Sequence, residues 1–278
     1  MPYRRTAVSL ALAPLLISLT APAHAFDESK YPNWKGQWIE PGVNRTSPWD
    51  TTLPGPGEQA LLTPQYQAVL AASIKAEANG GPPLDPTSRC MPAGMPRMMM
   101  ALQPLEIVIT PRMTYFMFAA LESLRRIYTD GRTFQGDIEP SFTGTSIGHW
   151  QDSDGDGRFD TLLIETRAIR GPHTYDASGI PFHKDGEATV TEKIYADKAD
   201  PNILRDEITT NDHALKEPWT VTRRYRRSAE AQPEWGEVAC KQNASRVLIG
   251  DQYYSVSPEG LLMPAVKGQK RPDLKYFK

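Results

Sequence analysis

Residues 187–226 read EATVTEKIYADKADPNILRDEITTNDHALKEPWTVTRRYR, and this segment decides the fold class. It divides into three runs, 187–196, 203–210 and 219–226, in which apolar and polar side chains alternate. Alternation with a period of two is typical of β-strands that bury one face. The connections between the runs are short and contain Pro, Asp and Asn, which favours turns between neighbouring strands.

The same alternation recurs in shorter runs elsewhere in the chain. These runs lie at 105–110, 113–119, 124–128, 160–167, 234–241 and 246–254. Many short strands without helices between them indicate an antiparallel sheet system. We therefore predict a mainly β fold, an antiparallel up-and-down β-barrel of the lipocalin or calycin kind over 104–256. A β-sandwich is the alternative.

The N-terminal third follows a different pattern. Residues 26–60 are irregular and predict a strap that its aromatic residues, Trp34, Trp38 and Trp49, anchor to the protein surface. Thr63 and Pro64 are typical residues for the start of a helix. The expected apolar stripe of this helix is Tyr66, Val69, Leu70 and Ile74, and its expected end is Gly80 and Gly81. A loop rich in Pro and Met completes this region at 103, and 257–278 form a C-terminal tail.

Length and composition exclude several classes of protein. The chain has 278 residues, 40% of them hydrophobic, and a formal net charge of −2. A chain of this size and apolar content can bury a full core, which excludes global disorder. The absence of a basic excess argues against nucleic acid as the main partner. The sequence contains no phosphate-binding loop, dinucleotide fingerprint or G-x-S-x-G motif, so nucleotide-dependent chemistry is disfavoured.

Residues 1–25 have the pattern of a cleavable signal peptide. Arg4 and Arg5 precede an apolar stretch at 7–19, and Ala23-His24-Ala25 fits a cleavage site. The apolar stretch is too short to span a bilayer, so we expect no membrane anchor. The expected location of the mature protein is periplasmic or secreted, and both the general and the twin-arginine export routes stay open.

Two cysteines, Cys90 and Cys240, lie far apart in the sequence. In an oxidising compartment, a disulfide bond between them is the expected state. The alternative is a catalytic thiol or a metal ligand. Neither cysteine has a second cysteine or a histidine at ligand spacing, which favours the disulfide.

The segment DSDGDGRFD at 152–160 concentrates carboxylates in a short loop. Asp152, Asp154, Asp156 and Asp160 supply four acidic groups, and the backbone carbonyl of Arg158 supplies a further oxygen. Oxygen ligands at this spacing suit a hard cation such as Ca²⁺. The alternative is an Asp/Gly turn that holds no ion, although four acids so close together repel one another.

This loop resembles EF-hand-like calcium loops, and more closely those of integrin-type (FG-GAP) repeats, where the loop leads directly into a strand. The expected strand here begins after Asp160. Leu163 occupies the position at which an EF-hand has its bidentate Glu. The resemblance therefore implies a structural calcium site that water completes.

Four ionisable residues interrupt the apolar faces of the predicted strands. Glu192 lies between Val190 and Ile194 on one face, and the others are Asp206, Arg223 and Arg126. Buried charges must be paired or must be used. Two readings stay open: a structural network of Glu and Arg inside the barrel, or a set of polar groups that faces a ligand.

Several segments resemble a large family of uncharacterised exported bacterial β-rich proteins. They are Arg89-Cys90-Met91-Pro92, Gly94-Met95-Pro96-Arg97, the run from Arg125 to Arg132, Ser146-Ile147-Gly148-His149-Trp150, Glu207-Ile208-Thr209-Thr210 with Asp212-His213, and Pro218-Trp219-Thr220. The match covers most of residues 60–245. It implies an exported, β-rich, one-domain protein and carries no assigned activity.

Together these patterns predict an exported barrel that encloses a small, largely hydrophobic or aromatic molecule. The leading hypothesis is a cofactor-free acid–base enzyme, a lyase, hydratase or isomerase, because a carboxyl group on an apolar wall has a raised pKa and can exchange protons near neutrality. Its candidate residues are Glu192, Asp206, His213, Tyr128, Arg126 and Arg223. The alternative is a non-catalytic, calcium-stabilised binding or envelope protein.

Overall fold

The computed structural model describes most of the chain between Phe26 and Trp235, together with a few segments nearer the C-terminus. The described residues are 26–43, 47–53, 61–78, 85–120, 123–171, 173–230, 232–236, 246–249, 252–256, 261–263 and 268. The predicted signal peptide, the two glycines expected to end the helix, and Cys240 lie outside them. Among the described residues, no helix has the length and apolar character needed to cross a bilayer.

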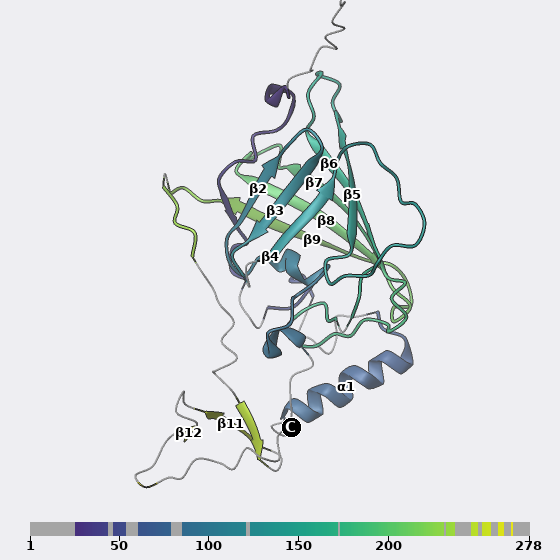
Figure 1. The fold of residues 1–278 in the computed structure, drawn as a ribbon, viewed down its shortest axis with the longest axis vertical. Coiled ribbons are helices and arrows are strands. Elements are labelled where there is room, and N and C mark those ends of the chain that lie inside the picture. Colours follow the sequence, from purple (N-terminus) through teal and green to yellow (C-terminus); the bar gives the residue numbers. More distant parts are fainter. Residues whose placement is uncertain are drawn as a thin grey trace, which may run out of the picture.

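Nine strands close into a barrel (Figure 1). They are β1 (Gln37–Ile39), β2 (Leu105–Ile109), β3 (Met113–Phe118), β4 (Ser123–Tyr128), β5 (Thr145–Gln151), β6 (Thr161–Arg167), β7 (Thr189–Ala196), β8 (Ile203–Asn211) and β9 (Trp219–Arg227). Each strand pairs with its neighbours in chain order, and β1 closes the barrel by pairing with both β2 and β9. The predicted mainly β fold, a closed barrel with one helix, is confirmed.

The barrel departs from a purely antiparallel design between β4 and β5. These two strands run parallel and pair only at Ile127 with Ser146 and at Tyr128 with Ile147. The connection at 129–144 carries the chain back to the end from which β4 began. A side chain at Gly148 would place its Cβ 2.7 Å from Cγ2 of Ile127, so glycine permits the close approach of β4 and β5.

Strand β1 comes from the N-terminal strap, where the sequence pattern predicts no strand. Trp34, Trp38 and Trp49 are all buried, so the expected aromatic anchors do attach the strap. The indole nitrogen of Trp38 also donates a hydrogen bond to the carbonyl oxygen of Trp34, at 2.9 Å. The strap is therefore an integral part of the barrel wall.

One end of the barrel is filled by a short 3₁₀ helix, Arg97–Met100, in which all three methionines are buried. The hydroxyl of Tyr225 on β9 donates to the carbonyl oxygen of Met99, at 2.5 Å. The sulfur of Met99 lies 3.3 Å from Nη1 of Arg125 on β4. The methionine-rich loop thus occupies the barrel interior. Among the described residues, two further 3₁₀ helices lie at Glu28–Lys30 and Pro86–Arg89.

Helix α1 (Pro64–Ala78) lies outside the barrel, below its lower end in Figure 1. It buries Tyr66, Leu70 and Ser73, whereas Val69 and Ile74 are exposed. The predicted apolar stripe is therefore wrong for Val69 and Ile74. A helix that contacts the protein along a single line buries only positions near i, i+4 and i+7.

The C-terminal strands do not join the barrel. β10 (Arg246–Ile249), β11 (Gln252–Val256) and β12 (Leu262–Met263) form a separate antiparallel three-stranded sheet. The sequence pattern at 246–254 was expected to supply a barrel strand, and that expectation is wrong. The run at 234–241 is not a strand over its described residues 234–236, and 237–241 lie outside the described residues.

Candidate functional site

The alternation of the strands places Glu192, Asp206 and Arg223 inside the barrel. Their exposed fractions are 3%, 0% and 1%. They come from three adjacent strands, β7, β8 and β9, in which every second residue is buried. The sequence pattern predicts this inward orientation correctly.

On β4 the predicted orientation is wrong by one residue. Arg126 is exposed, and its neighbour Arg125 is 1% exposed inside the barrel. The prediction placed the buried face of this strand on the side of Leu124, but Leu124 is an apolar residue that is 50% exposed on the outer surface. Ile127, which is fully buried on the same face as Arg125, is the signal that identifies the correct face.

Arg125 and Glu192 form a buried ion pair with two hydrogen bonds. Nη1 of Arg125 lies 2.7 Å from Oε1 of Glu192, and Nη2 bonds to Oε2. Nη2 also lies 3.0 Å from the hydroxyl of Thr166, and Nε lies 3.3 Å from that of Ser146. The two hydroxyls are 2.8 Å apart. Because its charge and polar atoms are matched, this network needs no ligand to complete it.

A second ion pair joins β9 to the strap. Nη1 of Arg223 lies 3.1 Å from Oε1 of Glu40, and its guanidinium carbon lies 4.5 Å from the ring centroid of Trp49. Burial raises the pKa of Glu40 to about 7, although the charge of Arg223 opposes the shift. Among the described residues, Nε and Nη2 of Arg223 and Oε2 of Glu40 have no hydrogen-bond partner.

Asp206 lies between these two pairs. It is cross-strand neighbour to Arg223, yet neither of its carboxylate oxygens has a hydrogen-bond partner among the described residues. Burial, and then the charge of Glu192, raise the pKa of Asp206 well above its ordinary value, while Arg125 and Arg223 oppose the shift. The environment therefore favours the protonated carboxyl.

The remaining candidates lie elsewhere. Tyr128 is half-buried and lines a pocket on the outside of the barrel. His213 is 65% exposed at the barrel rim, where it lies beside Asp185 and His183. The structure thus brings together Glu192, Asp206 and Arg223, and it does not bring Tyr128, His213 or Arg126 to them.

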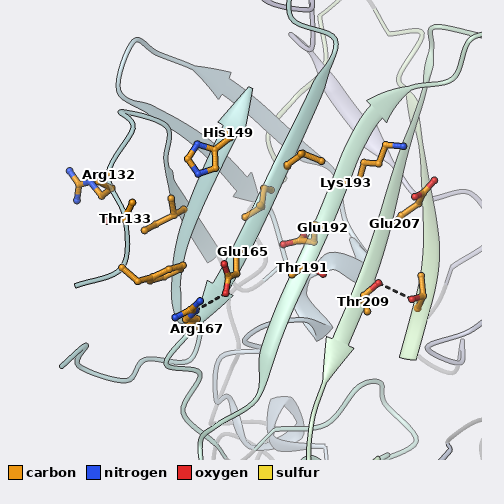
Figure 2. Close-up of a pocket in the computed structure, with 15 residues that line it drawn as sticks. Arg132, Thr133, His149, Glu165, Arg167, Thr191, Glu192, Lys193, Glu207 and Thr209 are labelled. Carbon is orange, nitrogen blue, oxygen red and sulfur yellow. Dashed lines mark hydrogen bonds and ion pairs between the residues drawn. The ribbon is translucent and has the colours of Figure 1, made fainter. Parts of the chain in front are cut away.

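A groove of about 640 Å³ lies on the outer surface of β5 to β9 (Figure 2). Its lining residues are Arg132, Thr133, Phe134, Ile147, His149, Leu163, Ile164, Glu165, Arg167, Thr191, Glu192, Lys193, Glu207, Thr209 and Thr220. Most belong to the outward-facing positions of these strands. A second pocket of about 550 Å³ adjoins it and shares Ile147 on β5 together with Arg132, Thr133 and Phe134 of the β4–β5 connection.

The groove combines an apolar surface with charged groups. Leu163 is 37% exposed, and the Arg167 guanidinium lies 4.5 Å from the ring centroid of Phe134. Nε of Arg167 also bonds to Glu165, at 2.6 Å. Lys193 is next to Leu163 across the strands and has no ion-pair partner among the described residues. Its ammonium nitrogen lies 4.9 Å from the ring centroid of Tyr195, so the groove offers an ammonium group that contacts an aromatic ring and has no carboxylate partner among the described residues.

The acidic loop at 152–160 is exposed and tightly turned. Carboxylate oxygens of Asp152, Asp154 and Asp156 lie within 4.8 Å of one another. The carboxylate of Asp160 instead accepts hydrogen bonds from the hydroxyl and backbone N–H of Ser153, at 2.5 and 3.2 Å. Three of the four predicted carboxylate ligands thus gather. The backbone N–H of Arg158 donates to Asp156, at 2.8 Å.

Cys90 ends a 3₁₀ helix in a left-handed conformation, with φ of 59°. Because Cys240 lies outside the described residues, the disulfide stays a prediction. Comparison with family models, curated proteins and solved structures finds no match. The resemblance to the exported bacterial family therefore also stays a prediction.

Proposed function

We propose that this protein is an exported, non-catalytic binding protein whose barrel is a rigid support for a ligand site in the outer groove. The buried Arg125–Glu192 pair carries this proposal, because Glu192, a predicted acid–base group, is bound on both carboxylate oxygens by Arg125 inside the barrel. The groove, by contrast, has a volume typical of small-molecule sites.

The lining of the groove favours an amphipathic ligand with a flat apolar part and a negative charge. Phe134 and Leu163 provide apolar contact, and Lys193 provides the cation. The carboxylate of Glu165 accepts a hydrogen bond from Arg167, and that of Glu207 accepts one from the hydroxyl of Tyr195. Both of these carboxylates therefore already have partners. This ligand class keeps the aromatic or hydrophobic character that the sequence predicts.

The test uses fluorescence titration with anilinonaphthalene sulfonate, a flat aromatic anion. Leu163→Asp should weaken its binding at least about tenfold, because it removes apolar contact and neutralises Lys193. Val108→Asp is the matched control, since Val108 is 42% exposed on β2, outside the groove. If the two variants bind anilinonaphthalene sulfonate with equal affinity, the groove is not the binding site.

A second candidate function, a cofactor-free lyase, hydratase or isomerase, is supported by Asp206. A buried carboxyl with a raised pKa and two oxygens without partners among the described residues could exchange a proton with a bound molecule. Native mass spectrometry separates the candidates. A co-purified molecule retained by Leu163→Asp and lost from Asp206→Leu would place the ligand inside the barrel and favour the enzyme.

We also propose that the loop at 152–160 binds Ca²⁺ in a structural role. The convergence of Asp152, Asp154 and Asp156 supports this proposal, since three carboxylates within 4.8 Å repel one another without a cation. Asp152 already accepts bonds from the backbone N–H groups of Gly155 and Gly157, at 2.7 and 2.8 Å. The turn is therefore held by Asp152 even when Asp154 is changed.

Calcium is expected to raise the melting temperature of the wild-type protein, because a ligand that binds only the folded state stabilises it. At about 100 times Kd the gain is about 2.7 kcal/mol. Asp154→Ala should abolish most of this gain, and Asp137→Ala, at another exposed aspartate, should preserve it. If a chelator leaves the wild-type unfolding curve unchanged, the segment is a turn without an ion.

A further inference from the structure

We propose that His183, Asp185 and His213 form a binding site for a divalent transition-metal ion, with Zn²⁺ as the occupant. Nδ1 of His213 lies 2.5 Å from Oδ2 of Asp185, and Nδ1 of His183 lies 2.8 Å from the same oxygen. The three ligand atoms all lie within 4.8 Å of one another. No local motif reveals this cluster, because His213 is distant in sequence from the other two residues.

The β7–β8 pairing brings the two segments together. Thr189, where β7 begins, is paired with Asn211, where β8 ends. His183 and Asp185 precede the first of these positions, and His213 follows the second. Cross-strand pairing therefore places both segments at the same end of the barrel.

Several contacts fix the His183 segment before any metal binds. The carboxylate of Asp212 accepts a hydrogen bond from the backbone N–H of His183, at 3.0 Å. The hydroxyl of Tyr66 on α1 accepts one from the backbone N–H of Lys184, at 3.3 Å. The rings of Tyr66 and His183 lie 5.2 Å apart. Ligands held by surrounding structure lose little freedom on binding a metal.

The ligand atoms of the cluster lie close enough together to share one cation. The backbone N–H of Asp185 donates to Nδ1 of His183, at 3.2 Å, so this nitrogen presents a lone pair. The same nitrogen lies 2.8 Å from a carboxylate oxygen, which also presents lone pairs. Either a proton on Nδ1 or a metal ion bound to both atoms removes the repulsion between these lone pairs.

The ligand set determines the class of metal. Two imidazole nitrogens and one carboxylate suit Zn²⁺, whereas Ca²⁺ takes oxygen ligands. The carboxylate of Glu187 lies 4.0 Å from Nδ1 of His213 and is 71% exposed, so it or a water molecule can complete four-coordination. A bound ion would tie the segment before β7 to the connection between β8 and β9.

The test is isothermal titration of the untagged full-length protein with zinc chloride, after chelator treatment and with excess Ca²⁺ to occupy the acidic loop. Wild type should bind one Zn²⁺ per chain at this site. His213→Ala and Asp185→Asn should each weaken binding at least about 100-fold. His149→Ala, at an exposed histidine on β5, should bind as wild type does.

A second measurement reports the ligands directly. Co²⁺ added in place of Zn²⁺ should give visible absorption bands of a four-coordinate nitrogen and oxygen site, and His183→Ala should abolish them. Circular dichroism of each variant confirms that the barrel is intact. Zn²⁺ binding that is unchanged in His213→Ala, or the absence of a saturable site in wild type, would reduce the cluster to a set of hydrogen bonds and overturn the proposal. Neither outcome depends on the groove.

Discussion

Arg125→Met is expected to destabilise the protein by about 3–5 kcal/mol, because it leaves the charge of Glu192 buried without its partner. Both side chains are almost fully enclosed, at 1% and 3% exposure. The hydroxyls of Ser146 and Thr166, which bond to Arg125 in wild type, do not replace its positive charge. Denaturant unfolding followed by tryptophan fluorescence measures the loss.

Two further variants make this result specific. Arg126→Met changes the adjacent arginine, which is exposed, and should alter stability by less than about 0.5 kcal/mol. The double variant Arg125→Met with Glu192→Leu should recover much of the loss, because apolar residues can replace a buried ion pair. If Arg125→Met and Arg126→Met are equally mild, the pair does not stabilise the fold.

The same series tests the role of Glu192. A purely structural Glu192 requires a permanent cation, and Arg125 meets this requirement. Glu192→Gln should then lower stability substantially. Although Glu192 belongs to the groove lining, its side chain is 3% exposed and bonds to Arg125 inside the barrel, so anilinonaphthalene sulfonate binding should stay intact. A stable Glu192→Gln protein that loses a natural ligand would instead favour the acid–base enzyme.

Asp206→Asn is expected to stabilise the protein increasingly as the pH rises. The folded state holds Asp206 with a raised pKa, so it keeps a proton that the unfolded chain releases above its ordinary pKa of about 4. The contribution of Asp206 to the free energy of unfolding is therefore fully present at low pH. It falls as the pH rises toward the pKa that Asp206 has in the folded state. The slope is about 1.4 kcal/mol for each pH unit. Asparagine has no proton to lose, so it avoids this cost.

Other buried groups contribute to the pH dependence of wild type. Glu40, with a pKa raised to about 7, acts in the same direction as Asp206 and lowers stability by up to about 3 kcal/mol as the pH rises from about 4.5 to 7. His173 acts in the opposite direction, since burial lowers its pKa to about 4 and stability rises with pH between about 4 and 6.5. The difference between wild type and variant removes the contribution of His173, whereas that of Glu40 is coupled to Asp206, because the charge of Glu40 helps to raise the pKa of Asp206.

The measurement is the free energy of unfolding of wild type and Asp206→Asn at a series of pH values from 5 to 9, on the order of one pH unit apart. The difference should grow in favour of the variant. Glu40→Gln is the matched control, because its advantage should stop growing near pH 7. A constant difference between wild type and Asp206→Asn would show that Asp206 is ionised in the folded protein.

The sequence predicts the parts of this molecule that depend on local periodicity. Strands β7, β8 and β9 follow directly from alternation, and so do the inward positions of Glu192, Asp206 and Arg223. Alternation fixes orientation only where the apolar positions are all buried. On β4 the exposed Leu124 gave the wrong face, and Arg125 was missed for that reason.

Features that depend on contacts between distant segments could not be predicted. Strand β5 contains Ser146, Gly148 and His149, a weak strand pattern, and it pairs with β6 along its whole length and with β4 at two positions. The cluster of His183 and His213 forms only when β7 and β8 pair. The outer groove likewise exists because a connection passes beside neighbouring strands, and no single segment encodes it.

The three residues of β1 affect the order in which the barrel can fold. Trp38 pairs with Leu105 and with Arg227, so a segment synthesised early completes its pairing only after the last barrel strand exists. Before β1 lies between them, β2 and β9 each have an unpaired edge, the kind of surface on which sheets of different molecules join. The strap of one molecule could fill that gap in another, which would produce a domain-swapped dimer. Closure by the molecule's own strap therefore protects it against self-association.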